Sequence, residues 1–412
     1  MADIRPFKAI RPKSGLEEAI SALPYDVYNR EEATRLVAGD QNSFLRIDRA
    51  ETQFSAEVDT YDDRVYAKAK ELFEEMLADG RFAEDDEERY FLYELTMNGR
   101  TQTGIVAVAS IDDYLNGVIK KHENTRADKE ADRIRHVDTL SAQTGPIFLA
   151  YKNNFVINQL VDRAKEKEPY FDFFSKELIR HRGFMISEPE EIRKFKGALA
   201  GLSSVYIADG HHRCASAVKV GLKRREENPG YTGEEDFNYF LSVLFPDSEL
   251  FIMDYNRVVK DLNGHTKEEI LDYFDGKGAL LPQSGTAPYH PETKGNIGIF
   301  LEDQWYSFYF GEDIKSDDPV EGLDVSILQR EFLEPLFGIA DPKTDARIDF
   351  VGGIRGLKEL ENRCHKDAKI AFAMFPTAIW ELFTVADEGL LMPPKSTWFE
   401  PKLRSGLFIH RI

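Results

Sequence analysis

The most constraining feature of the sequence is the stretch Asp209-Gly210-His211-His212-Arg213, which joins two different local patterns. An apolar β-like run, residues 205–207, precedes it, and a helical pattern over residues 215–220 follows it. The stretch therefore predicts a strand, a tight glycine turn and the first turn of a helix. Because such a turn has unpaired backbone N–H groups and the positive end of the helix dipole, it is a site for anions.

The side chains of this turn add chemistry to the anion site. Histidine exchanges protons near neutral pH, and arginine holds phosphate or carboxylate with a planar fork. We expect Asp209, His211 and His212 to be catalytic, with Gly210 and Arg213 binding phosphate. The alternative is structural, with one histidine capping the helix and the arginine pairing with an acid. The arginine favours phosphate over a metal ion, so no metal ligand is predicted.

Composition excludes several classes of protein. The 412 residues carry a net charge of −20, which argues against broad nucleic-acid binding. Hydrophobic residues make up 42% and aromatic residues 12%, which supports real cores. The two cysteines, Cys214 and Cys364, favour a reducing cytoplasm. The sequence shows no apolar membrane span, no signal peptide and no P-loop motif.

Strand and helix patterns alternate along the chain, which predicts an α+β (mixed α/β) fold. The Asn98-Gly99 pair is typical of a hairpin turn. The expected first domain covers residues 1–265, and a C-terminal α/β unit covers residues 266–412, whose segment 390–405 returns to the site. Helices are expected over residues 31–37, 61–78, 127–140, 154–164, 189–195, 267–274 and 325–336, and a charged loop over residues 223–235.

A second cluster of charged side chains precedes and enters the predicted helix 127–140. In that helix Lys129, Arg133 and His136 lie at i, i+4 and i+7 and share one face that borders the core. Such a stripe in an acidic chain favours a site for a polyanionic small molecule. The alternative is a solvated face neutralised by acids on the same helix. The residues assigned here to such a polyanion are Lys120, His122, Arg126, Lys129, Arg133 and His136.

Two further segments hold candidate residues. Asp26, in the segment 24–27 with the sequence Pro-Tyr-Asp-Val, is a candidate general base, with a turn residue as the alternative. Glu123 is the other candidate base. Lys395 lies in the proline-stiffened segment 392–402 and is a candidate cation for phosphate, whereas the aromatic residues beside it are expected to pack in a core.

The motifs together resemble a known bacterial family. The segments 24–27 and 120–126, the sequence Gln143-Thr144-Gly145-Pro146, the turn at 209–213, and the segments 393–397 and 401–402 recur together in the family catalogued as domain of unknown function 1015. The resemblance covers nearly the whole chain. The chain departs from it at Cys214, where members have an aromatic residue, and at Asn256, where they have histidine.

That family is similar to the ParB/sulfiredoxin superfamily, which implies a core of that kind with large insertions. The superfamily includes free serine kinases, so the resemblance implies a phosphotransferase that moves a phosphoryl group between a donor and L-serine. The donor would be pyrophosphate, ADP or ATP, and Mg²⁺ would be expected with it. The turn at 209–213 would hold the transferred phosphate, and Asp26 or Glu123 would act on the serine hydroxyl.

Two other functions compete with the kinase hypothesis. A phosphoserine phosphatase would use the same pocket with water in place of the donor. A ParB-like nucleotide-dependent DNA-binding protein is the alternative from another class, although the acidic charge argues against it. The reaction direction, the donor and the oligomeric state stay open at this point.

Overall fold

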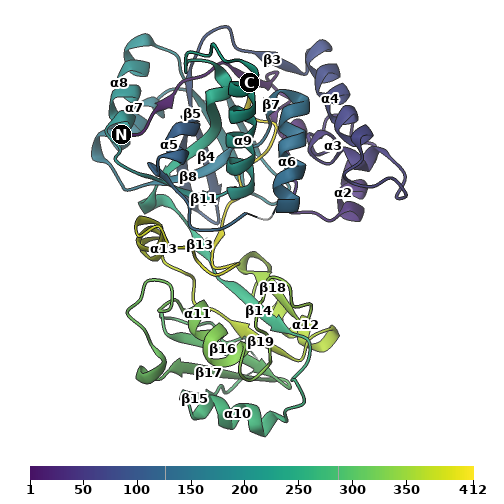
Figure 1. The fold of residues 1–412 in the computed structure, drawn as a ribbon, viewed down its shortest axis with the longest axis vertical. Helices are drawn as coiled ribbons and strands as arrows, with labels where there is room; N and C mark the ends of the chain where they lie inside the picture. Colours follow the sequence, from purple (N-terminus) through teal and green to yellow (C-terminus); the bar gives the residue numbers. More distant parts are fainter. Residues whose placement is uncertain (126, 286) are drawn as a thin grey trace. The chain divides into compact units, whose positions relative to one another are not determined.

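The computed structural model describes residues 1–125, 127–285 and 287–412, and these fold into two compact units. Unit 1 comprises Met1–Leu250 together with Pro401–Ile412, and unit 2 comprises Phe251–Glu400. The units thus divide after residues 250 and 400, whereas the sequence pattern placed one boundary at 265/266. The mixed α/β class that the sequence predicts is confirmed (Figure 1).

Unit 1 is built on a mixed sheet. Its strands lie in the order β6-β11-β8-β12-β5-β4-β10-β9, with β1 paired to β5. Their bounds are β1 (Ile4–Arg5), β4 (Tyr90–Met97), β5 (Arg100–Ser110), β6 (Ile119–Lys120), β8 (Ile147–Tyr151), β9 (Phe171–Phe174), β10 (Arg180–Ile186), β11 (Val205–Asp209) and β12 (Tyr239–Pro246). The predicted hairpin is confirmed, because β4 and β5 pair across Asn98-Gly99, and both turn residues have positive φ.

The topology of this sheet brings distant segments to the end of β11. Strand β6 pairs with β11 in parallel, and β8 pairs with β11 antiparallel. The residues that follow β6 and those that precede β8 therefore meet the turn that follows β11. The sheet thus gathers three of the motif segments without any of them being close in sequence.

Helices cover the sheet and extend beyond it. In Figure 1, α6 lies between α9 on one side and α4 on the other. The predicted helix 127–140 is confirmed as α6. The helices of unit 1 are α1 (Glu17–Ile20), α2 (Arg30–Val37), α3 (Leu45–Asp48), α4 (Asp63–Ala78), α5 (Ile111–Leu115), α6 (Ala127–Leu140), α7 (Phe155–Ala164), α8 (Pro189–Ala200) and α9 (His211–Glu227).

The prediction of a loop over residues 223–235 is wrong at its start, because α9 continues to Glu227. The charged side chains there are good helix formers, and two of them find partners on α6. Lys223 and Arg224 both form ion pairs with Asp138. These pairs also tie α9 to α6 along their length.

Two hydrophobic cores support unit 1. One lies under the large sheet and includes Leu149, Ile207 and, from α9, Val218. The other joins α2, α3 and α4 to a small sheet with the order β3-β2-β21-β7 and includes Phe44 and Ile409. The strands of the small sheet are β2 (Ala9–Pro12), β3 (Phe82–Glu84), β7 (Ala142–Gln143) and β21 (Ile409–Arg411).

Unit 2 has its own sheet, in the order β15-β17-β16-β19-β14-β18, and a separate pair, β13-β20. The predicted helix 325–336 is wrong in its extent, because α11 ends at Leu328 and a wider helical turn follows over Gln329–Leu333. The elements are β13 (Ile252–Met253), β14 (Tyr255–Val259), α10 (Lys267–Asp275), β15 (Gly278–Pro282), β16 (Asn296–Leu301), β17 (Gln304–Phe310), α11 (Asp324–Leu328), β18 (Ile348–Gly352), α12 (Lys358–Lys366), β19 (Ile370–Ala373), α13 (Ile379–Asp387) and β20 (Trp398–Phe399).

Candidate functional site

The turn between β11 and α9 has the geometry that its sequence predicts. Gly210 has φ +92°, in the left-handed region that favours glycine, and its N–H donates to Asp209 Oδ1 at 2.7 Å. The first backbone bond of the helix runs from Cys214 N to Gly210 O at 2.9 Å. The N–H groups of residues 211–213 therefore precede the helical bonding and lie at its positive end.

The guanidinium of Arg213 folds back over this turn. A Cβ on Gly210 would lie 3.1 Å from its Nε and Nη2 atoms. Its Nη1 donates to the carbonyl of Pro146 at 2.5 Å, and a Cβ on Gly145 would lie 3.6 Å from Nη1. Two glycines and one carbonyl therefore fix the arginine beside the N-terminus of α9.

Asp209 is held by a residue from the C-terminal end of the chain. Lys402 Nζ lies 2.9 Å from Asp209 Oδ2. Burial raises the pKa of Asp209, but Lys402 and then Arg213 outweigh burial and bring the pKa below its usual range. Asp209 is therefore a carboxylate at neutral pH. Site prediction from the sequence missed Lys402, although the Pro401-Lys402 pair belongs to the motifs that carried the resemblance.

Two histidines pack together beneath the turn. The backbone N–H of His122 donates to Nε2 of His211 at 3.5 Å. The two imidazole rings meet edge to face, with their centroids 4.5 Å apart. Burial lowers the pKa of His122 to about 4, and burial followed by the neighbouring His122 lowers the pKa of His211 well below its usual value. Both rings are neutral at pH 7, so they add no positive charge to the turn.

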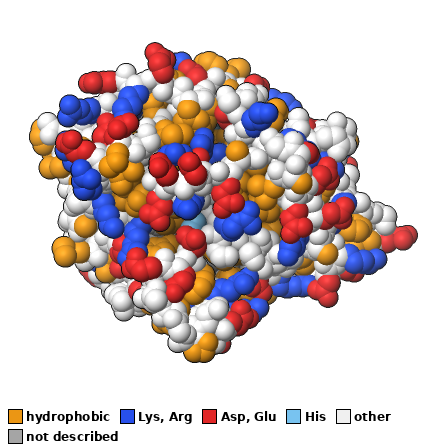
Figure 2. All heavy atoms as spheres, turned by 90° about the horizontal axis from the view of Figure 1, so that it is seen from above, with side chains coloured by type: hydrophobic (Ala, Val, Ile, Leu, Met, Phe, Trp, Pro, Cys, Tyr) orange, Lys and Arg blue, Asp and Glu red, His pale blue; other side chains and the backbone are white. Residues whose placement is uncertain are grey.

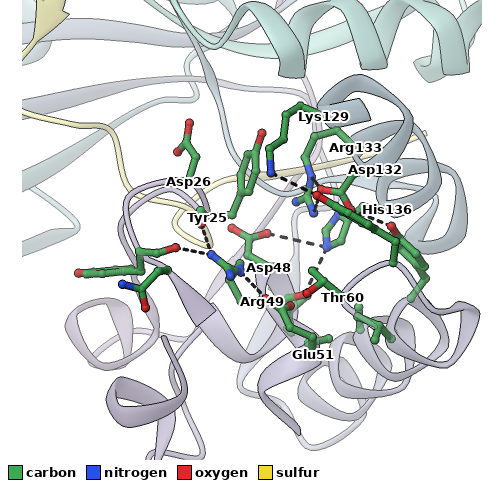
Figure 3. A pocket seen from close by; sticks show the side chains of 18 residues that line it. Tyr25, Asp26, Asp48, Arg49, Glu51, Thr60, Lys129, Asp132, Arg133 and His136 are labelled. Carbon is green, nitrogen blue, oxygen red and sulfur yellow. Dashed lines mark hydrogen bonds and ion pairs between the residues drawn. The ribbon is translucent and has the colours of Figure 1, made fainter. Parts of the chain in front are cut away.

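A cavity of about 280 Å³ lies beside α6 (Figure 3). It is lined by side chains from the loop after Pro24, from the segment 47–51, and from α4 and α6. Its lining residues are Tyr25, Asp26, Tyr28, Asn29, Ile47, Asp48, Arg49, Ala50, Glu51, Thr60, Tyr61, Val65, Tyr66, Ala69, Lys129, Asp132, Arg133 and His136. The volume suits a small molecule rather than a macromolecule.

The α6 stripe predicted from the sequence lines this cavity, with much of its charge compensated. Arg133 is buried, stacks on the ring of Tyr25 at 4.0 Å and donates through Nε to Asp132 Oδ2 at 2.9 Å. Lys129 Nζ lies 3.2 Å from the hydroxyl of Tyr61. The stripe therefore borders a cavity, and one of its cations has an acid on the same helix.

Asp48, which sequence reasoning did not single out, lies at the inner wall. Its side chain is 4% exposed, Oδ1 accepts from the hydroxyl of Thr144 at 2.9 Å, and His136 Nε2 lies 4.0 Å away. Burial and then the neighbouring Arg133 lower the pKa of His136 to about 4. The signal that could have found this residue is a carboxylate directly after residues 44–47, three of which are apolar.

The loop that carries Tyr25 and Asp26 is fastened by Arg49. The Arg49 guanidinium donates to Tyr25 O at 2.8 Å and to Glu51 Oε1 at 2.6 Å. Asp26 is exposed in a turn (Figure 3). Burial raises the pKa of Tyr25 far above its usual value, which Arg133 only partly offsets, so the phenol stays protonated and can donate a hydrogen bond.

A small second cavity borders both the turn and the large cavity. Its volume is about 30 Å³, and Tyr25, Asp48, Arg133 and His136 line both cavities. The small cavity adds Arg213 of the turn, and Thr144 and Gly145 of the segment before β8. Arg213 and the large cavity are therefore close together in unit 1, with the small cavity and its shared side chains between them.

The remaining predicted residues are distributed as follows. Lys120 lies on β6, with its ammonium 5.9 Å from the ring centre of Tyr206 on β11. Glu123 is not among the described residues that line either cavity. Lys395 belongs to unit 2, and Arg126 lies outside the described residues.

The described residues hold no group of three or more His, Cys, Asp or Glu side chains that could bind a metal ion. A Mg²⁺ ion in this site would therefore have to be held mainly by phosphates, as Mg²⁺ often is. Within the same residues, no helix is both long and apolar enough to cross a membrane. On the face drawn in Figure 2, acidic and basic side chains are interspersed, so that face offers no continuous basic surface for a nucleic acid.

Comparison with solved structures finds weak likenesses. SbnI with C-terminal truncation from Staphylococcus aureus has a TM-score of 0.38 and 11% identity, over 72% of this chain and 82% of that one. A glutamate-to-glutamine mutant of free serine kinase in complex with AMP has a TM-score of 0.36 and 13% identity, over 72% and 87%. A conserved hypothetical protein from Pyrococcus furiosus has a TM-score of 0.33 and 12% identity, over 73% and 93%. At these TM-scores the likeness carries no conclusion about function.

Sequence comparison is more decisive about the family. No curated protein matches the chain. One family profile matches residues 4–326, which is most of the chain and contains the turn, the large cavity and the motif before β8. The chain belongs to the family described as protein of unknown function (DUF1015).

Proposed function

We propose that the protein is a small-molecule phosphotransferase that moves a phosphoryl group between a phosphate donor and L-serine. The observation that carries the proposal is that the turn and the large cavity adjoin the same small cavity. Four side chains, Tyr25, Asp48, Arg133 and His136, line both the large cavity and the small cavity that Arg213 reaches. A phosphate at the N-terminus of α9 would therefore lie next to a molecule bound in the cavity.

The turn supplies what phosphoryl transfer needs, which is positioning and neutralisation of charge. The N–H groups of residues 211–213 and the fork of Arg213 would hold the transferred group. His212, half-buried in the first turn of α9, lies at the same end of the helix. Lys402 keeps Asp209 ionised and adds a cation beside the turn. Mg²⁺ arriving with pyrophosphate, ADP or ATP would neutralise further charge on the donor.

The cavity suits a small acceptor that carries both charges. Glu51 and Asp132 are paired with Arg49 and Arg133. The ammonium of Lys129 and the carboxylate of Asp48 form no such pair with a described residue. A free amino acid with a hydroxyl, as the family resemblance implies, would place its carboxylate at Lys129 and its hydroxyl at Asp48. The unpaired cysteines 214 and 364 are consistent with our placing the reaction in a reducing cytoplasm.

Phosphorus NMR tests this proposal. The protein is incubated with Mg²⁺, L-serine and one donor per tube, and a further tube holds O-phosphoserine alone. A growing phosphoserine signal in one donor tube is the expected result, and it should be lost in His212→Ala. Phosphate released from phosphoserine alone would favour the phosphatase instead. Silence in every tube would contradict serine as the substrate.

A further inference from the structure

Asp48 differs from the other acids of the cavity in its partners. Glu51 and Asp132 each bind an arginine, whereas no lysine or arginine among the described residues forms an ion pair with Asp48. The hydroxyl of Thr144 donates a hydrogen bond to Oδ1 of Asp48, so Oδ2 of Asp48 is the oxygen that can contact a ligand. A carboxylate this deeply buried, with Arg133 nearby but no cation in an ion pair with it, is costly for the folded state. Such a group is a candidate for chemistry.

The neighbouring histidine adds no positive charge beside this carboxylate. His136 Nε2 lies 3.3 Å from the carbonyl of Ile47, so the N–H on that nitrogen donates to the backbone. The ring is buried and neutral at pH 7, and it therefore cannot replace a cation. Asp48 thus faces both cavities as an acceptor of a hydrogen bond or of a proton.

We propose that Asp48 is the general base of the phosphotransferase, a role that rests on the proposed function. The acceptor hydroxyl loses its proton to Asp48 Oδ2, and the hydroxyl oxygen forms a new bond to the phosphorus held at the N-terminus of α9. The bond from phosphorus to the leaving phosphate oxygen breaks, and its electron pair goes to the leaving group. The proton then passes from Asp48 to solvent as the product leaves.

One motif positions both the base and the phosphate clamp. Thr144 donates to Asp48, and two residues later the carbonyl of Pro146 accepts from Arg213. The segment Gln143-Thr144-Gly145-Pro146 therefore sets the distance between the proton acceptor and the arginine. Gly145 allows close packing of this segment, because a Cβ there would lie only 3.0 Å from Ser405 Oγ. Thr144 is accordingly a positioning residue.

The two bases expected from the sequence are placed less well for this step. Asp26 is exposed at the wall of the large cavity and does not line the small one. Glu123 lines neither. Asp48 lines both cavities. A base needs this position when the acceptor lies in the large cavity and the phosphate lies beside the small one.

The test compares isosteric variants of the full chain by steady-state kinetics and by donor-binding calorimetry. We expect Asp48→Asn to lower kcat about 100-fold or more, the usual effect of removing a general base, while donor affinity stays within threefold. Asp26→Asn should lower kcat less than tenfold. Glu57→Gln changes an exposed carboxylate outside both cavities and serves as the control.

A second pair of variants keeps the test sharp if Asp48→Asn does not fold. Thr144→Val should lower kcat about tenfold with little change in acceptor KM, and Thr144→Ser should restore it, because the hydroxyl is what orients Asp48. Near-normal kcat in Asp48→Asn, or in Thr144→Val, would overturn the assignment, as would a larger loss in Asp26→Asn. A wild-type protein that binds donor without any transfer would overturn the proposed function and the base together.

Discussion

At the residue scale, the site depends on how Arg213 is held. Gly210 lets the guanidinium of Arg213 fold back over the start of α9, because glycine has no side chain in the way. The sequence could predict this turn, because its parts are adjacent. It could not predict that Lys402 would pair with Asp209, because 193 residues separate them. Nor could it predict that Asp48 would meet Thr144 across 96 residues.

Replacing Gly210 with alanine should damage the turn. The backbone there has φ +92°, and the new Cβ would lie 3.1 Å from guanidinium atoms of Arg213. We expect a loss of about 1 to 3 kcal/mol in the free energy of unfolding, measured with urea, and at least tenfold weaker donor binding. Gly197→Ala is the matched control, because α8 is helical there and its Cβ meets nothing within 4 Å. It should gain about 0.5 to 1 kcal/mol. Equal effects of the two substitutions would contradict this account.

Replacing Lys402 with methionine should make the free energy of unfolding depend less on pH in the acidic range. The pKa of Asp209 is lowered in the folded protein, so the group stabilises the fold above its unfolded pKa and loses that contribution as pH falls. The variant should be less stable by about 1 to 3 kcal/mol above pH of about 4, and the difference should shrink below that pH. Urea unfolding at several pH values measures it. A difference that is constant with pH would argue against the ion pair.

At the element scale, α6 and the loop before α2 build the cavity from opposite sides. The helical period correctly predicted α6 and the common face of Lys129, Arg133 and His136, because both follow from local spacing. Which charges on that face are neutralised depends on geometry between elements. Tyr66 of α4 donates to Asp132 at 2.8 Å, a contact that no local pattern reveals.

The Arg49→Lys variant tests how the Tyr25–Tyr28 loop is held. Lysine keeps the charge but lacks the fork that reaches Tyr25 O and Glu51 together. We expect the free energy of unfolding to fall by about 1 to 2 kcal/mol and the acceptor KM to rise severalfold. Urea denaturation and steady-state kinetics measure the two effects. An unchanged KM would show that the loop needs no such anchor.

At the scale of the whole molecule, unit 2 is inserted between β12 and the C-terminal segment of unit 1. Its two ends lie together, because Glu400 N donates to Phe251 O at 3.1 Å and β13 pairs with β20. The segment 401–412 brings Lys402 to the site and supplies core residues such as Phe408. The sequence anticipated a C-terminal return but not where the units divide, since the strands at the division are only two residues long.

Unit 1 should therefore fold without unit 2. A chain of residues 1–250 joined by a short glycine-serine linker to residues 401–412 should give a cooperative thermal transition by circular dichroism. The same chain without residues 401–412 loses β21 and its buried side chains, so it should melt at a clearly lower temperature or aggregate. Identical melting of the two chains would contradict the role given to the C-terminal segment.

The most direct test of the account is calorimetric titration of the donors into wild-type protein and into Arg213→Met, with Mg²⁺ present. If α9 and Arg213 hold the donor phosphate, ATP, ADP or pyrophosphate should bind the wild type. The variant should bind that donor at least tenfold more weakly while its thermal unfolding stays cooperative. Equal affinity in the two proteins, with the fold intact, would contradict the central claim.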